Sequence, residues 1–157
     1  MPANFVKGDI FDEATQEGGV RALAFPADCG GTMDTGIASA VKKRWPKLAD
    51  ELAAHGATNK MQLGDVYAWR DGDLFIYALG IQKGGAKPKV SSVERALQSA
   101  AKRAVDDGVV RILLPRIGGG KSGLDWARVK HVIVETGAAT HIDLVVFEQF
   151  VRKAPEA

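Results

Sequence analysis

Short apolar segments that alternate with helical patterns constrain the fold of this chain more than any other feature. These segments are rich in branched and aromatic residues and are bounded by Gly or Asp, which is typical of buried strands. They span residues 21–27, 65–70, 74–81, 111–117 and 142–150. Because strands that alternate with helices build layered α/β proteins, we predict an α/β domain with a mostly parallel sheet.

One strand pair and one helix carry the clearest local signals. Residues 70–73 read Arg-Asp-Gly-Asp between two of the strands, and an Asp-Gly pair favours a tight turn, so this pair should form an antiparallel hairpin. Apolar residues recur at three- and four-residue spacing over 91–107, which predicts an amphipathic helix. Ser91 and Glu94 have the spacing of a capping box, and Gly108 is expected to end the helix.

Two further helices are expected after glycine-rich loops. One spans about 36–45, and Pro46 either closes it or opens the next helix. The other spans about 124–136, because Ser122-x-x-Asp125 has the spacing of a second capping box and Gly137 can end the helix.

Composition excludes several classes of protein. A chain of 157 residues with 46% hydrophobic residues can fill one core but is too short for two ordinary domains. The net charge of +2 argues against a general nucleic-acid-binding or membrane-binding surface. A single cysteine, Cys29, excludes an internal disulfide framework, and there is neither an apolar run of membrane-spanning length nor a secretory leader. We expect one domain over residues 1–150, a frayed tail over 151–157, a cytoplasmic location and a monomer.

Three loops that follow predicted strands are candidates for a ligand site, because ligands of α/β sheets usually lie beyond the carboxyl ends of strands. They span residues 26–36, 80–89 and 118–123, and the first and third are glycine-rich turns that lead into helices. Glycine lets the backbone approach a ligand closely, and the unpaired N–H groups at a helix N-terminus attract anions. The two glycine-rich loops together predict a site for a nucleotide-like ligand with a diphosphate.

The third loop imitates the phosphate loop of nucleotide hydrolases without completing it. Gly120, Lys121 and Ser122 match the end of that pattern, but Pro115 stands where its first glycine belongs. Residues 123–157 also leave room for only one helix and one strand, whereas such hydrolases build most of their sheet after the motif. The dinucleotide-binding glycine pattern fits no better, because a dehydrogenase carries it on its first strand.

The order and spacing of four motifs resemble the macrodomain family, an ADP-ribose-binding module. The motifs are VKGDIFDE, GGTMDTGIA, LPRIGGG and DLVVFE, and they extend over nearly the whole chain. The resemblance implies a three-layer α/β/α fold with a central mixed sheet. VKGD, GIA, PRIG and the following Trp126 look most like the ALC1-like group of terminal ADP-ribose glycohydrolases and DNA-ADP-ribose antitoxins.

The resemblance also implies which residues meet the ligand. Asp9 and Phe147 of the last strand should bind adenine. The start of the 36–45 helix should meet one phosphate, and the glycine-rich loops should close over the diphosphate and the distal ribose. The residues concerned are Asp9, Ile10, Gly31, Thr32, Thr35, Gly36, Ile37, Ala38, Gly118, Gly119, Gly120, Lys121, Ser122 and Phe147. Three alternatives stay open: Asp9 is a turn aspartate, Phe147 belongs to the core, and Asp34 or Thr35 is a helix N-cap.

The catalytic residues of that group are incomplete here. Its hydrolases use a lysine after the central strand, where this chain has Gln82 with Lys83 one place on, and an aspartate where this chain has Ser122. A second macrodomain class has an aspartate in its first glycine loop, in a setting that Thr-Met-Asp-Thr-Gly partly resembles. We therefore take Asp34 as the leading catalytic candidate, able to orient ribose hydroxyls or activate water. Gln82 and Lys83 are the candidates in the second loop.

The resemblance implies a hydrolase that removes mono-ADP-ribose from proteins through glutamate or aspartate esters, or that cleaves O-acyl-ADP-ribose. Its expected partners are ADP-ribose and mono-ADP-ribosylated proteins. The alternatives are a non-catalytic ADP-ribose reader, an ADP-ribose phosphate phosphatase, and a hydrolase for which nucleic acid is the modified substrate. We expect no cofactor and no metal, since His55, His131 and His141 lack ligand spacing.

Overall fold

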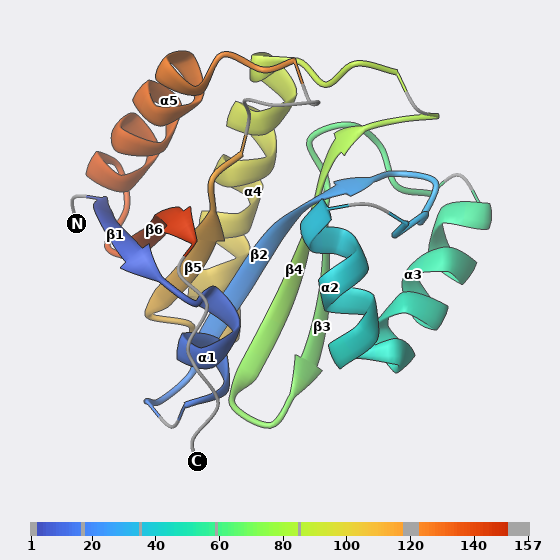
Figure 1. Cartoon of the computed structure of the whole chain (residues 1–157), viewed down its shortest axis with the longest axis horizontal. Coiled ribbons are helices and arrows are strands. Elements are labelled where there is room, and N and C mark those ends of the chain that lie inside the picture. The colour runs from blue at the N-terminus through green and yellow to red at the C-terminus, as the bar shows by residue number, and fades with distance from the viewer. Residues whose placement is uncertain are drawn as a thin grey trace.

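The computed structural model describes residues 3–16, 18–34, 36–58, 60–84, 86–117 and 123–150. The strands are β1 (Asn4–Gly8), β2 (Arg21–Asp28), β3 (Val66–Asp71), β4 (Leu74–Gln82), β5 (Arg111–Pro115) and β6 (Asp143–Phe150). The helices are α1 (Ile10–Thr15), α2 (Gly36–Arg44), α3 (Pro46–Ala57), α4 (Val90–Asp107) and α5 (Trp126–Ala138). Figure 1 shows the strands enclosed between helices on both sides.

The strands form one six-stranded sheet in the order β1-β6-β5-β2-β4-β3. Four neighbouring pairs are parallel, and only β3 and β4 pair in the antiparallel sense. The predicted hairpin and the predicted fold class, a three-layer α/β/α arrangement with a mixed and mostly parallel sheet, are therefore confirmed.

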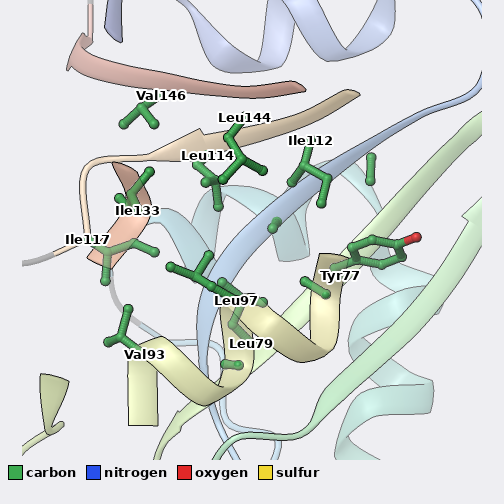
Figure 2. Packing of buried hydrophobic residues seen from close by; sticks show 14 of the residues in the cluster. Tyr77, Leu79, Val93, Leu97, Ile112, Leu114, Ile117, Ile133, Leu144 and Val146 are labelled. Atoms are coloured by element: carbon green, nitrogen blue, oxygen red, sulfur yellow. The ribbon is translucent and has the colours of Figure 1, made fainter. Parts of the chain in front are cut away.

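Each face of the sheet has its own buried cluster. On one face, α4 and α5 pack on the sheet, and Figure 2 shows Val93 and Leu97 of α4 directed toward strand residues such as Leu79 and Leu114. On the other face, α1, α2 and α3 pack on the sheet around the fully buried Phe25. The sheet is thus apolar on both sides, as parallel sheets require.

Two helix starts differ from the sequence prediction. The capping box at Ser91 is wrong, because α4 begins at Val90 with Lys89 at the N-cap position and no side-chain cap. Val90 packs on the buried cluster, which draws it into the first turn. Gly108 ends α4 in the left-handed conformation with φ of 73°, as predicted.

The second capping box is also corrected. α5 begins at Trp126, and Asp125 is its N-cap, with Oδ1 accepting from the backbone N–H of Ala127 at 3.0 Å. Ser122 lies outside the described residues. Gly137 does not end the helix, since α5 continues to Ala138 and buries Gly137 on its inner face.

Other boundaries of strands and turns differ from the sequence prediction by one or two residues. Pro46 opens α3 as its first residue, a position where the missing N–H costs nothing. The loop of the hairpin is formed by Gly72 and Asp73, one residue later than the predicted Asp-Gly pair. β5 ends at Pro115, before Ile117. No described helix is both long enough and apolar enough to cross a membrane.

Candidate functional site

The topology creates a crevice at the carboxyl edge of the sheet. β2 and β5 are parallel neighbours, but β2 leads into α2 on one face while β5 leads to α5 on the other. Two adjacent strands whose connections diverge in this way leave an opening between their loops, and ligands of α/β proteins bind at such points. The predicted glycine-rich loops follow these same two strands.

A cavity of about 400 Å³ opens at this edge, over the ends of β1, β5 and β6. It brings together three predicted ligand residues from distant parts of the chain: Ile10 at the start of α1, Ile37 in the first turn of α2 and Phe147 in β6. Its other lining residues are Phe11, Pro115, Arg116 and Glu148. The cavity therefore has mostly apolar walls with two charged residues among its lining, as small-molecule sites usually do.

Asp9 is the N-cap of α1. Its Oδ1 accepts from the backbone N–H groups of Phe11 at 3.0 Å and Asp12 at 3.3 Å. The alternative interpretation of Asp9 as a local structural aspartate is thus supported, and its contact with adenine stays a prediction. The cap also fixes the position of Ile10 and Phe11, which line the cavity.

Phe147 belongs to the core and to the cavity at once. It is 7% exposed and packs with the residues under α1 to α3. The backbone of Gly8 lies against its ring, since a β-carbon there would be 3.3 Å from Cε2. The two interpretations of Phe147 are therefore compatible with one another.

The loop from β2 to α2 is held by backbone contacts. The N–H of Cys29 donates to the Gln82 carbonyl at 2.7 Å, and the Asp28 carboxylate accepts from the N–H of Gly30 at 2.7 Å. Gly31 has a φ of +86°, and a β-carbon there would be 2.6 Å from the Leu52 carbonyl oxygen of α3. The loop thus packs so closely on α3 that only glycine fits.

The same loop presents the leading catalytic candidate to solvent. Thr32 and Asp34 are exposed, and Met33 between them is buried and anchors the loop. α2 begins at Gly36, and the interpretation of Asp34 or Thr35 as its N-cap stays a prediction. The predicted ligand residues Gly36 and Ala38 lie in the first turn of α2. Thr35 lies outside the described residues.

The two catalytic candidates of the second loop, Gln82 and Lys83, have different surroundings. Gln82 ends β4 and is half-buried, with its backbone carbonyl bonded to Cys29. Lys83 is exposed, and its Nζ donates to Oε1 of Gln62, in the segment between α3 and β3, at 3.0 Å. The structure thus engages Lys83 with a neighbour on the outer side of β4.

The third predicted group, Gly118, Gly119, Gly120, Lys121 and Ser122, lies outside the described residues. Their flanks are described: Ile117 is buried, and Gly123 has a φ of +73°. The described flanks lead from the end of β5 toward the N-cap of α5.

A polar and aromatic cluster that sequence reasoning missed supports one wall of the cavity. Trp126 Nε1 and Lys130 Nζ both donate to Glu148 Oε1, at 3.1 and 3.2 Å. The guanidinium carbon of Arg116 lies 5.1 Å from the centroid of the Trp126 ring. The bond from Trp126, followed by that from Lys130, lowers the pKa of Glu148, which keeps this carboxylate charged. In the sequence, the one signal for this cluster is that Arg116 and Glu148 each follow directly after buried strand residues.

Neither thiol nor metal chemistry finds support among the described residues. Cys29 is 2% exposed, as expected for a small buried residue, and burial followed by the charge of Asp28 raises the pKa of its thiol. Within the described ranges, no group of three His, Cys, Asp or Glu side chains is placed to hold a metal ion.

A family model described as the Macro domain matches residues 24–133. The chain belongs to the macrodomain family. It is 28% identical to the ADP-ribose glycohydrolase OARD1 of Homo sapiens over 144 residues, which cover 91% of this chain and 89% of the relative. It is 27% identical to a DNA ADP-ribosyl glycohydrolase of Thermus aquaticus, over 92% of this chain and 40% of the relative.

A solved macrodomain has the same fold. The macrodomain of Thermus aquaticus DarG superimposes with a TM-score of 0.81 at 24% sequence identity, over 93% of this chain and 97% of the other. The resemblance predicted from the four sequence motifs is thus confirmed at the level of family and fold.

Proposed function

We propose that this macrodomain hydrolyses ADP-ribose conjugates, with mono-ADP-ribose on protein glutamate or aspartate, or O-acyl-ADP-ribose, as substrate. One observation carries the proposal: Ile10, Ile37 and Phe147, predicted to bind ligand from separate motifs, line one cavity beside the glycine-rich β2–α2 loop. The family and the ADP-ribose glycohydrolase OARD1 of Homo sapiens support the same ligand class.

The proposed ligand lies with its adenine in the cavity. Ile10, Ile37 and Phe147 offer apolar surface to the purine, and Phe147 is fixed by the core behind it. We place Asp9, whose carboxylate accepts from the N–H groups of Phe11 and Asp12, beside the adenine amino group, because a carboxylate has several acceptor positions. The diphosphate then passes the first turn of α2, whose N–H groups favour anions.

Asp34 is the proposed general base. It is exposed at the tip of a loop that is otherwise fixed by packing, so its carboxylate can reach the distal ribose while its backbone stays in place. A water molecule held by this carboxylate attacks the anomeric carbon, and Asp34 accepts the proton that the water loses. The bond from the anomeric carbon to the ester oxygen breaks, and its electron pair leaves with the carboxylate of the acceptor.

A non-catalytic ADP-ribose reader is the second candidate, and one contact favours it. Gln82 stands where the resemblance places a catalytic lysine, and the neighbouring Lys83 donates to Gln62. A hydrolase with a nucleic-acid substrate is a third candidate, supported by the similarity to the DNA ADP-ribosyl glycohydrolase of Thermus aquaticus.

The test is to incubate the pure protein with a glutamate-modified target that carries labelled ADP-ribose, and to titrate free ADP-ribose in a calorimeter. Release of label together with binding in the micromolar range, about −8 kcal/mol, supports the hydrolase. Binding without release supports the reader, and release only from modified DNA supports the third candidate. Failure to bind ADP-ribose contradicts all three.

Substitution of Asp34 separates binding from chemistry. Asp34→Asn keeps the shape of the side chain and removes the base, so turnover should fall by about a hundredfold or more while ADP-ribose affinity changes little. Asp50→Asn in α3, another exposed carboxylate, is the matched control. Unchanged turnover in Asp34→Asn would exclude Asp34 as the base.

A further inference from the structure

The side chain of Lys87 crosses from the β4–α4 loop to the segment that precedes α5. A β-carbon placed on Gly123 would lie 3.7 Å from Cε, 3.8 Å from Nζ and 3.9 Å from Cδ of Lys87. Both segments run over the amino ends of α4 and α5 at the same end of the molecule (Figure 1). The end of the Lys87 side chain therefore lies close to Gly123, where a side chain at that position would meet it.

Lys87 differs from the other cations of its loop. It is exposed, and among the described residues no hydrogen-bond or ion-pair partner is found for its ammonium. Lys83 instead donates to Gln62. Lys89 is the N-cap residue of α4, and the first turn of that helix contains no acidic side chain. The positive charge of Lys87 and the amino end of α4 thus both favour an anion at this edge of the sheet.

The sheet order places the loop of Lys87 at the same edge of the sheet as the cavity but at some distance from it. The cavity lies over the ends of β1, β6 and β5, whereas the loop of Lys87 starts from β4, on the other side of β2. Neighbouring strands lie about 4.8 Å apart, so β6 and β4 are about 14 Å apart. In the proposed binding mode, with the base in the cavity and the diphosphate at the β2–α2 loop, the distal ribose and the acceptor group extend toward β4 and the loop of Lys87.

We propose that Lys87 is a catalytic residue that stabilises the departing acceptor carboxylate during ester hydrolysis; this inference rests on the proposed function. Water adds to the anomeric carbon as the carbon–oxygen bond to the acceptor breaks, and the electron pair of that bond becomes the negative charge of the carboxylate. The proton of the water goes to Asp34 and then to solvent. The ammonium of Lys87 remains protonated and binds the carboxylate more strongly as its charge develops, which lowers the barrier.

The experiment measures hydrolysis of a glutamate-linked ADP-ribosyl peptide by the full chain. Lys87→Gln should lower kcat by about tenfold or more and leave ADP-ribose affinity within about twofold, while Lys87→Arg restores much of the rate. Lys89→Gln, which removes an exposed charge two residues away, is the matched control and should behave as wild type. Thermal unfolding of each variant verifies that the fold is retained.

A second substrate reports on the leaving group itself. ADP-ribose esterified at its anomeric carbon with chloroacetate releases a more acidic carboxylate than the matching acetate ester and needs less stabilisation, so the defect of Lys87→Gln should be smaller on the chloroacetate ester. A purely structural lysine would give equal defects on both esters, and that result overturns the proposal. So does a loss of ADP-ribose affinity with unchanged kcat, or an unimpaired Lys87→Gln. If the wild type itself releases nothing, the proposed function falls first and this inference falls with it.

Discussion

The β2–α2 loop and the β4–α4 loop leave neighbouring strands at the same edge of the sheet but are held in different ways. Around the first, a β-carbon on Gly31 of the loop would overlap the backbone of α3, and a β-carbon on Gly56 of α3 would overlap the backbone of the loop. In the second, Gly84 has open space around it, the N–H of Ala86 donates to the Lys83 carbonyl at 3.2 Å, and Lys83 Nζ donates to Gln62. The first loop thus has a fixed shape, and the second carries adaptable charges.

This difference suits two different tasks in the proposed reaction. A base such as Asp34 must hold water within hydrogen-bond distance of one carbon atom, which demands a rigid backbone. A cation that meets the acceptor group must tolerate acceptors of different shape, which a flexible lysine does. The predictions below test this contrast, from the largest expected effect to the smallest.

Gly56→Ala should be strongly destabilising. Its β-carbon would lie 2.3 Å from both the carbonyl carbon and oxygen of Gly30, and neither backbone segment can yield easily. Alanine gains about 1 kcal/mol in helix propensity, but we expect the overlap to outweigh this, with a net loss of about 3 kcal/mol in the free energy of unfolding. Urea unfolding measures it, and ADP-ribose affinity should fall together with stability.

Gly84→Ala is the matched change in the other loop. Gly84 has a φ of +62° with nothing within 4 Å of an added β-carbon, so only the cost of the left-handed conformation, about 1 kcal/mol, is expected. Equal losses in Gly56→Ala and Gly84→Ala would contradict the distinction between the two loops.

Asp28→Ala should cost about 1 kcal/mol in the free energy of unfolding, because the carboxylate accepts from the N–H of Gly30 at 2.7 Å and fixes the start of the loop. Asp28→Asn retains an acceptor oxygen at the same place and should stay closer to wild type. Chemical denaturation of both variants decides this, and equal losses in Asp28→Asn and Asp28→Ala would show that the charge of Asp28, not the acceptor oxygen, fixes the loop.

Gln62→Ala should have the smallest effect. It removes the acceptor of Lys83 Nζ at an exposed position, where such contacts contribute only a few tenths of a kcal/mol. Unfolding should be nearly unchanged, and turnover should not fall if Lys83 has no part in chemistry. A large loss of turnover would restore Lys83, held by Gln62, as a catalytic candidate.

Much of the fold could be predicted because it rests on patterns longer than a few residues. β2, β4 and β5 are apolar and mostly buried, and α4 has a long amphipathic pattern. β1 and α1 escaped prediction because β1 is a five-residue edge strand with Asn4 and Lys7 exposed, and α1 has only six residues. Short elements of this kind depend on their tertiary neighbours more than on their own sequence.

The parts of the site that depend on the backbone and on the position of a residue along the chain could be predicted. The contacts that depend on the conformation of long side chains could not. The motifs located Ile10, Ile37 and Phe147, which do share a cavity. Lys83 and Lys87 look equivalent in a glycine-rich loop, and only the structure separates a lysine bonded to Gln62 from one that lies along Gly123. Arg116 likewise meets Trp126 through a contact between loop and helix that spacing does not encode.

The most direct test of the central claim is calorimetric titration of ADP-ribose into the wild type and into Ile37→Trp. Ile37 is half-buried at the cavity, so a tryptophan there fills the space proposed for adenine with little cost to the core. Val134→Trp, at a position on α5 that is 44% exposed, is the control. We predict micromolar binding by the wild type and Val134→Trp and a loss of about tenfold or more in Ile37→Trp. Equal affinity in all three proteins, or no binding by the wild type, would contradict the account.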